Sequence, residues 1–456
     1  MGLLGTIGIL IGICTIILLV VKEVHITIAA LIASLLVVLL NNMDVIKTLL
    51  GSEPVANPAK VGTFLYNPHA FMPALGDYII SYFAIFLFGA ILAKFMEASG
   101  ATVSIANFIL KKFGSDSPYR VLVAVFVITT LLTYGGISLF VAMFAIIPLA
   151  RALFKKLDIA WTLVTIPLWL GLATITMVML PGTPAIQNVI PMTTLGTSLT
   201  ADALPSLVAA VATTIFGLFY MRYALNKSLK KGENFATYAD INDVDETNRE
   251  LPSFGASISP LLLLIIIAIS GSVLGNELVK KNVIYVALIL AILLSVILFR
   301  KFISQPKTTL TLGTTSAFAP IIATASAVAF GAVVVGAPGF EVIQKAIFHM
   351  PGGSLISLTA LTSVITAITG SSSGALGIVM PNFAQHYLAA GIQPQIIHRV
   401  AAVASGFATL VPQSGAFITF LALSKLKQKN SYKYAVTTVA VGNLIGLIII
   451  ILFASL

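Results

Sequence analysis

The sequence predicts an all-α polytopic membrane protein built from two inverted repeats. Three observations support this fold class. Of the 456 residues, 58% are hydrophobic and 9% are charged, whereas soluble globular domains carry about 25% charged residues. The mean hydropathy is +1.04, and apolar runs of about 20 residues, enough to cross a bilayer, recur along the chain. Two of these runs are interrupted by Gly/Pro-rich segments at matching positions.

The apolar runs predict membrane spans in chain order. No basic segment precedes the first run and no cleavage site follows it, so we expect a retained helix and not a signal peptide. Two of the spans, 160–198 and 398–424, are the interrupted ones. The expected spans are 2–21, 24–41, 78–97, 160–198, 203–224, 257–275, 282–299, 314–336, 398–424 and 434–455.

Two further apolar stretches have the wrong length for spans. Residues 121–150 are too long for one crossing and too short for two, at about 20 residues each. Thr133-Tyr134-Gly135-Gly136-Ile137-Ser138 breaks this stretch in its middle. Residues 355–388 are similar and are broken by residues 369–374. We predict that both are re-entrant helical hairpins, which turn inside the membrane and leave on the side where they entered.

The distribution of basic residues predicts the orientation, because cytoplasmic loops carry an excess of Lys and Arg. Basic residues flank the first hairpin on both sides, which places its ends in the cytoplasm. The second hairpin has only Lys345 and Arg399 as flanks, so we expect it to enter from outside. All other Lys and Arg side chains are assigned to the cytoplasm, and both termini are expected outside. The basic residues assigned to the outside are Lys47, Lys60, Lys280, Lys281, Lys345 and Arg399.

The two halves show the same order of elements. Phe88-Gly89-Ala90 corresponds to Phe330-Gly331-Ala332, Pro148 to Pro381, and Pro181 to Pro412. The first half starts outside and the second inside, so we predict an inverted repeat. Residues 1–224 form the first repeat and 257–456 the second, each with five spans plus one re-entrant hairpin. The charged segment 225–256 between them is predicted to be a solvated cytoplasmic linker.

The interruptions are the candidate binding site. Two prolines in Pro181-Gly182-Thr183-Pro184, and one in Pro412-Gln413-Ser414-Gly415, should end helices inside the membrane. A broken membrane helix is tolerated where it lines a cavity, and its free N–H groups attract an anion. Packing of small residues is the alternative role for any one of these positions. The candidate substrate-binding residues are Thr133, Tyr134, Gly135, Gly136, Ser138, Gly182, Thr183, Gln187, Asn188, Thr369, Gly370, Ser371, Ser372, Ser373, Gln413, Ser414 and Gly415.

The charged residues restrict the substrate. We expect no Asp, Glu, Lys or Arg at mid-membrane, and we place His398 and Arg399 at the outer interface, as anchors or as guides for an anionic substrate. Without a buried counter-charge, a multiply charged substrate is costly to desolvate. A monocarboxylate that travels with one cation forms a neutral complex, which favours a small carboxylate as partner.

Several classes of function are excluded or disfavoured. The net charge of +10 is typical of cytoplasmic loop bias, so we expect no nucleic-acid partner. The one cysteine, Cys14, excludes an intramolecular disulfide and a cysteine-based metal site, and the histidines show no metal-ligand spacing. The sequence contains no nucleophile–base pair, phosphate loop or redox motif. We therefore expect no enzyme activity, no metal site and no cofactor.

The chain resembles the gluconate permease family of the ion-transporter superfamily. The similar segments are 89–94, 112–114, 147–149, 180–185, Leu251-Pro252-Ser253-Phe254-Gly255 and 369–381. The resemblance implies proton-coupled uptake of small hydroxylated monocarboxylates, a scaffold plus transport domain, elevator-like alternating access and a homodimer in the cell membrane. Gluconate permeases have a carboxylate in the first hairpin tip and histidines in the helix breaks. Their absence here resembles the branch linked to short hydroxy acids such as 3-hydroxybutyrate.

The sequence thus predicts a proton symporter that imports a small hydroxylated monocarboxylate such as 3-hydroxybutyrate or gluconate. Two alternatives stay open. The first is a sodium-coupled carboxylate transporter or exchanger, with sodium as the coupling ion. The second belongs to another class, a channel or receptor on the same scaffold.

Overall fold

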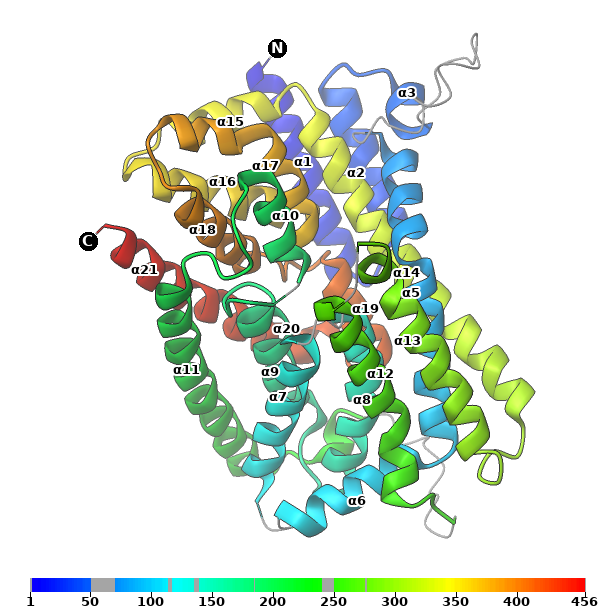
Figure 1. Cartoon of the computed structure of the whole chain (residues 1–456). Helices are drawn as coiled ribbons and strands as arrows, with labels where there is room; N and C mark the ends of the chain where they lie inside the picture. The colour runs from blue at the N-terminus through cyan, green and yellow to red at the C-terminus, as the bar shows by residue number, and fades with distance from the viewer. Residues whose placement is uncertain are drawn as a thin grey trace.

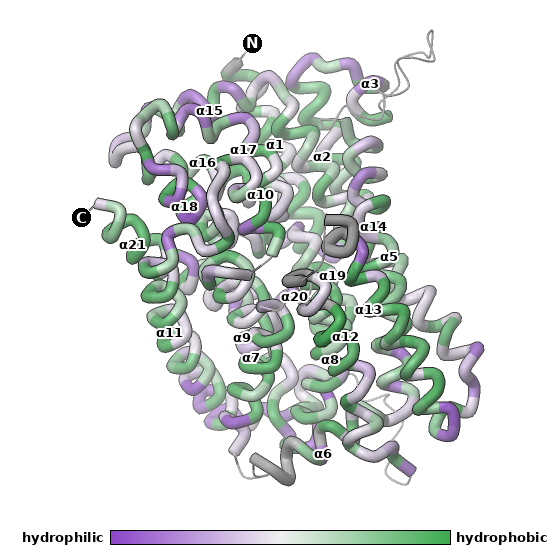
Figure 2. Tube along the Cα trace, in the orientation of Figure 1, coloured by the Kyte–Doolittle hydropathy of each residue, from purple (hydrophilic) through white to green (hydrophobic). Residues whose placement is uncertain are grey.

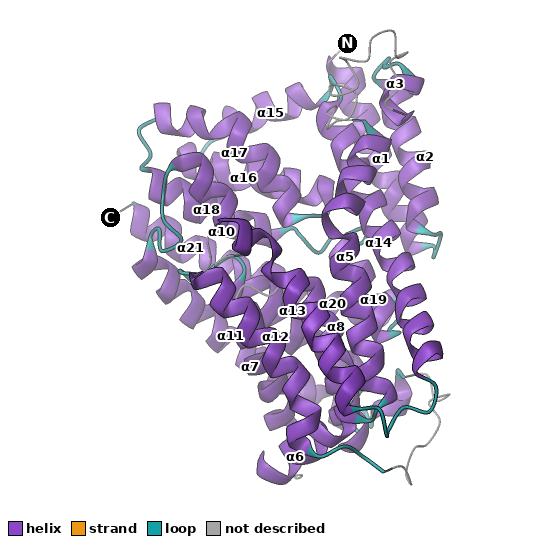
Figure 3. Ribbon diagram, turned by 45° about the vertical axis from the view of Figure 1, so that its right-hand side comes forward, coloured by secondary structure: helices purple, strands orange, loops and turns teal. Residues whose placement is uncertain are grey.

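The protein is helical throughout the part of the chain that the structure describes. This computed structural model describes residues 2–50, 70–113, 117–134, 139–183, 185–239, 250–274 and 277–455. Helices and connecting loops make up these ranges, and no strand occurs in them (Figure 3). Five described stretches are long and apolar enough to cross a membrane: Leu3–Val21, Phe71–Ala98, Ala203–Lys230, Pro306–Gly336 and Gln428–Ala454. The predicted all-α class is therefore confirmed.

One group of helices, which we call the outer group, stands on one side of the molecule (Figure 1). Its two longest helices, α5 and α14, pack along each other, while α1 packs on α2 and α12 packs on α13. The members are α1 (Gly2–Val21), α2 (Ile26–Leu40), α3 (Val45–Leu50), α5 (Phe71–Ala98), α12 (Phe254–Leu274), α13 (Glu277–Leu298) and α14 (Pro306–Gly336).

The second group, which we call the inner group, contains both hairpins and both broken helices. These helices pack mainly on one another, and they meet the outer group where α5 contacts α8 and where α14 contacts α16 and α19. The members are α7 (Pro118–Tyr134), α8 (Leu139–Lys156), a 3-10 helix (Trp161–Val164), α9 (Thr165–Trp169), a π-helix (Leu170–Thr176), α10 (Ile186–Leu195), α11 (Ala203–Lys230), α16 (Gly353–Thr369), α17 (Ser372–Ala389), α18 (Pro394–Phe407), α19 (Gly415–Ser424), α20 (Gln428–Val436), a π-helix (Thr437–Val441) and α21 (Gly442–Ala454).

Two short helices that the sequence analysis did not predict connect the groups. They are α6 (Ala101–Phe113), which packs on α8 and α12, and α15 (Phe340–Phe348), which packs on α1 and α16. α15 buries Phe340 and Ile347 and carries Glu341 and Lys345 elsewhere on its surface. Figure 1 places α6 and α15 at opposite ends of the molecule.

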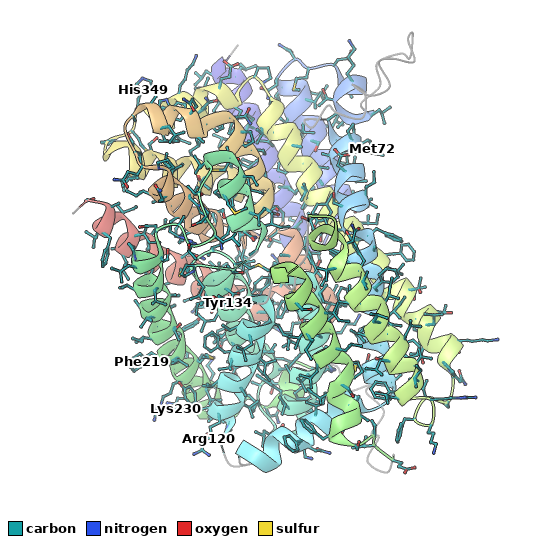
Figure 4. All side chains as sticks on the ribbon, in the orientation of Figure 1. Met72, Arg120, Tyr134, Phe219, Lys230 and His349 are labelled. Atoms are coloured by element: carbon teal, nitrogen blue, oxygen red, sulfur yellow. The ribbon has the colours of Figure 1, made fainter. Side chains whose placement is uncertain are left out.

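Paired helices are present at both predicted hairpins. α7 and α16 have 17 residues each, and α8 and α17 have 18. At 1.5 Å per residue these helices are roughly 26 Å long, shorter than the ~30 Å hydrocarbon core. Figure 4 places Tyr134, the last residue of α7, at mid-height, with Arg120 and Lys230 near one end and His349 at the other. The first helical pair therefore turns near mid-height of the molecule, and the re-entrant course of both pairs stays a prediction.

Apart from α3, which has no counterpart in the second half, the described helices follow the same order in both halves: two helices, a long helix, a short connecting helix, a helical pair, a broken helix and a last helix. Figure 2 shows hydrophilic residues gathered around α3 and α15 at one end and around the lower end of α11 at the other, with apolar helices between them. The layout is that of a protein whose middle zone contacts lipid.

Several predicted boundaries were wrong. α5, α14 and α18 begin at Phe71, Pro306 and Pro394, ahead of the expected starts at 78, 314 and 398. α11 continues to Lys230, beyond the expected end at 224. The adjoining part of the predicted solvated linker is also packed, because Phe235 is buried against Trp161 with their ring centroids 5.9 Å apart.

Candidate functional site

The first helix break lies where the sequence placed it. The helix leaves α-geometry early, in the π-helical segment Leu170–Thr176, and α10 starts again at Ile186. Gly182 has φ = +86°, a conformation that glycine adopts without strain, and its N–H donates to the Leu199 carbonyl at 2.9 Å. Asn188 is fully buried and donates from Nδ2 to the Thr183 carbonyl at 3.2 Å. Gln187 is half-buried beside it.

Arg399 holds this break together, which corrects the predicted position of Arg399 at the outer interface. Its side chain is fully buried. Nη1 donates to the Val178 and Met179 carbonyls, at 3.3 and 3.4 Å, and to Asn188 Oδ1 at 3.0 Å. Nε and Nη2 donate to the Ala201 carbonyl, at 3.3 and 2.9 Å, and Nη2 also to the Leu199 carbonyl at 3.5 Å.

The guanidinium therefore connects the residues before the break, the first turn after it and the loop that precedes α11. Val178 and Met179 belong to the end of the interrupted helix, where unpaired carbonyls accumulate partial negative charge. In the described part of the chain no carboxylate makes a direct salt bridge with Arg399, although the Asp202 carboxylate, in the loop before α11, attracts the guanidinium electrostatically. Pro394 starts α18 four residues ahead of the expected start, so Arg399 lies in the second turn of the helix and is buried inside the protein.

His398, also predicted at the interface, is fully buried as well. Its Nδ1 lies 2.7 Å from Thr197 Oγ1 and its Nε2 lies 3.4 Å from Asn188 Oδ1. The imidazole and the guanidinium thus approach the same amide oxygen.

Among the described residues, neutral groups hold the second break, residues 408–414. Gln413 Nε2 donates to the Ala367 carbonyl at 3.1 Å, and Ser414 Oγ donates to the Gly370 carbonyl at 3.1 Å. Gly415 begins α19, and its carbonyl accepts from Thr324 Oγ1 at 3.0 Å. The break therefore joins the second hairpin to the long helix α14.

The first hairpin tip reaches the first break. Thr133 Oγ1 and Thr176 Oγ1 are 2.6 Å apart and buried, and Tyr134 Oη donates to the Pro181 carbonyl at 3.3 Å. The other residues predicted at this tip, Gly135, Gly136 and Ser138, lie outside the described residues.

The second hairpin tip reaches the second break and α18. Gly370 turns the chain with φ = +59°. Thr369 Oγ1 donates to the Ser371 carbonyl at 3.1 Å, and Ser371 Oγ caps α17 by accepting from the Gly374 N–H at 3.1 Å. Ser372 Oγ lies 2.6 Å from Ser405 Oγ, and the Ser373 side chain interacts with Tyr82 of α5. α10 packs on α17, so the second hairpin contacts both broken helices.

Each break leaves one buried polar atom without a partner. Thr183 Oγ1 and Gln413 Oε1 have no hydrogen-bond partner although their residues are 0% and 1% exposed. Such atoms cost about 1–3 kcal/mol each when they stay unpaired. Of the predicted site residues that the structure describes, these two have side-chain atoms poised to bind something else.

Other features of the molecule do not resemble a binding site for a polar substrate. One pocket lies between α5, α8, α12 and α13 and is apolar, with Leu92, Met96, Phe144 and Leu288 among its lining residues. Within the described ranges, no cluster of three or more His, Cys, Asp or Glu side chains is arranged to hold a metal ion.

Comparisons with known proteins identify the family. The model of the GntP family permeases matches residues 67–456. The chain is 29% identical over 418 residues to the uncharacterized transporter YxjC of Bacillus subtilis (strain 168), with 83% of this chain and 88% of YxjC covered. The crystal structure of the Alcanivorax borkumensis YdaH transporter aligns with 94% of this chain and 97% of its own, at 13% identity and a TM-score of 0.43. Because the family model extends over most of the chain, the protein belongs to the GntP permease family, and it is a multi-pass transporter of the cell membrane and not an enzyme.

Proposed function

We propose that this transporter imports a small hydroxylated monocarboxylate, such as 3-hydroxybutyrate or gluconate, together with a proton. The observation that carries the proposal is the pair of buried, unpartnered atoms at the two breaks, Thr183 Oγ1 and Gln413 Oε1.

The chemistry of these two atoms is complementary to a hydroxy acid. A threonine hydroxyl can donate a hydrogen bond to a carboxylate, and it lies just before the N-terminus of α10, where backbone N–H groups favour an anion. The Gln413 Oε1 atom can only accept, so it matches a substrate hydroxyl. A hydroxy acid supplies both the carboxylate and the hydroxyl.

The charge near the first break favours one carboxylate over two. Among the described residues, Arg399 is a cation in direct contact with this break, and its donors are already engaged by carbonyls and Asn188. A dicarboxylate would bring a second charge that nothing described at the two breaks neutralises, and burial of an unpaired charge is costly.

The proposal includes an alternating-access movement. The inner group would move as one body against the outer group, with the substrate held between its hairpins and breaks, as in an elevator. The repeated order of elements and the opposite positions of α6 and α15 support two inverted repeats, 1–224 and 257–456, joined by 225–256. We further propose that the outer group forms the scaffold of a homodimer.

Thermal stabilisation of the purified protein tests the substrate class, because a ligand that binds the folded state raises the apparent melting temperature. The panel is 3-hydroxybutyrate, lactate, gluconate and succinate, each with and without sodium and at two pH values. We expect a shift with a short hydroxy acid that grows at lower pH. A sodium-dependent shift with succinate alone would overturn both the coupling ion and the substrate class.

A further inference from the structure

His398 is a buried titratable side chain beside the first break, and the predicted binding residues do not include it. It lies on α18 between Thr197 in the loop before α11 and Asn188 in the first turn of α10. Asn188 in turn donates to the Thr183 carbonyl. One side chain therefore separates the imidazole from the candidate carboxylate position.

The contacts of Asn188 determine which imidazole nitrogen carries the first proton. Asn188 Nδ2 faces a carbonyl, which only accepts, and Asn188 Oδ1 faces Arg399 Nη1, which only donates. The amide orientation is thereby fixed. Because Oδ1 can only accept, His398 Nε2 pairs with it as N–H, and the neutral imidazole has its lone pair on Nδ1.

A second proton would bind at Nδ1 without the loss of a hydrogen bond. Thr197 Oγ1 lies 2.7 Å from Nδ1 and, as a hydroxyl, can donate to the neutral ring or accept from the imidazolium. Thr197 is half-buried, and its neighbours Gly196 and Ser198 are exposed. The nitrogen that takes the proton is thus the one on the side of the solvent.

The charges around His398 make protonation of its imidazole more favourable when an anion is bound nearby. α18 packs on α10, α16, α17, α21 and the π-helix Thr437–Val441. The titratable groups of these described elements and of the adjoining loop are Arg399, Asp202, His386 and Tyr387. Arg399 shares Asn188 Oδ1 with His398, so an imidazolium would stand beside a guanidinium. A carboxylate bound at Thr183 would offset this repulsion.

We propose that His398 carries the proton that is transported with the substrate. The inference rests on the proposed function and names the coupling site. A proton from the outer solution adds to the Nδ1 lone pair when the substrate carboxylate binds, and it leaves as H⁺ when the substrate departs to the cytoplasm. No bond of the substrate is broken. Because coupling between two sites is reciprocal, the anion promotes protonation and the proton promotes anion binding.

The test uses the full-length protein in liposomes with a pH-sensitive dye inside and 3-hydroxybutyrate as the probe. His398→Gln keeps a donor for Asn188 and an acceptor for Thr197 but cannot be protonated. We expect substrate-driven acidification of the lumen to fall by about tenfold or more, a typical size for a coupling effect, while counterflow exchange of labelled substrate continues. The matched control is His386→Gln, since His386 is exposed and stacks on Phe348, and it should behave like the wild type.

The outcomes separate this inference from the proposed function. Intact proton coupling in His398→Gln would overturn the role of His398 but leave the proposed symport in place. Loss of coupling in Asp202→Asn alone would assign the proton to that carboxylate. If the wild-type protein moves 3-hydroxybutyrate without protons, or moves none of the acids, the proposed function itself fails. If His398→Gln does not fold, Thr197→Val is tested in its place. This variant removes the hydroxyl that accepts from the protonated Nδ1, so the pH profile of uptake should move to lower pH. An unchanged pH profile would contradict the proposal.

Discussion

The two broken helices differ in what holds their interrupted backbone. At the first break a buried guanidinium binds residues on both sides of the interruption through Val178, Met179 and Asn188. At the second break the ties are an amide and a hydroxyl, from Gln413 and Ser414, that bond to carbonyls of the second hairpin. At the first break a charged side chain therefore binds the two half-helices of the break itself. At the second break, neutral side chains of the break bind a different element, the second hairpin.

The charged contacts at the first break and the neutral contacts at the second indicate different roles for the two breaks in substrate binding under the proposed function. A fixed positive charge and a neighbouring imidazole would suit the carboxylate and the proton of the proposed symport. A neutral break with an acceptor atom suits a hydroxyl. Two breaks that correspond in sequence position thus need not have the same role.

The largest expected effect comes from removing the charge at the first break. In Arg399→Met, the Ala201 and Val178 carbonyls and Asn188 lose donors while they stay buried. At about 1–3 kcal/mol for each unpaired buried acceptor, we expect a loss of about 3 kcal/mol or more. Thermal unfolding in detergent measures this loss as a lower melting temperature.

Gln413→Met is the matched change at the second break, because it removes a single donor, to Ala367. Because the change also removes the buried Oε1 atom, which has no partner, the free energy of unfolding should fall by at most about 1 kcal/mol. Equal melting temperatures for the two variants would show that the guanidinium does not distinguish the breaks.

The helix breaks and the two helical pairs could be predicted from the sequence because their signals are local. A cluster of proline and glycine interrupts a helix at each break, whereas a single proline such as Pro320 or Pro381 stays inside its helix. The two stretches of about 30 residues that form helical pairs each carry such a polar, glycine-containing interruption in their middle, and the unbroken 31-residue helix α14 does not. The family resemblance rested on the same segments, and the family match confirmed it. The repeat was inferred from short anchors such as those around Gly89 and Gly331, and the order of elements agrees with it.

Arg399 could not be placed from the sequence, because its burial depends on distant residues. A His-Arg pair at the edge of an apolar run has the hydropathy that is typical of residues at a membrane–water interface. The acceptors that stabilise the buried guanidinium come from three segments far from α18 in the sequence: residues 178–179, Asn188 and residues 199–201. α6 and α15 were missed for another reason: they are short helices with polar faces, and a search for long apolar runs passes over them.

The next largest effect concerns function alone. Thr183→Val removes a buried hydroxyl that has no partner, so stability should stay equal or rise. Affinity for 3-hydroxybutyrate should fall about tenfold, which corresponds to the loss of about 1.4 kcal/mol. The affinity is measured from the rise in melting temperature as the concentration of 3-hydroxybutyrate increases.

Thr362→Val is the matched control for this prediction. Thr362 Oγ1 is also buried without a partner, but it lies within α16, away from its tip. Its removal should leave the affinity unchanged. If both variants bind equally well, the unpartnered atom at the first break is not part of the binding site.

The smallest effect compares the bonds that join each hairpin to a break. Ser414 Oγ donates to Gly370 in a buried position, whereas Tyr134 Oη donates to Pro181 at 3.3 Å from an exposed ring. Ser414→Ala leaves a buried carbonyl unpaired and should cost about 1 kcal/mol. Tyr134→Phe lets water replace the hydroxyl, so it should stay within about 0.5 kcal/mol of the wild type. A lower melting temperature for Tyr134→Phe than for Ser414→Ala would contradict this prediction. It would mean that the bond between the first hairpin and its break stabilises the fold more than the bond at the second break.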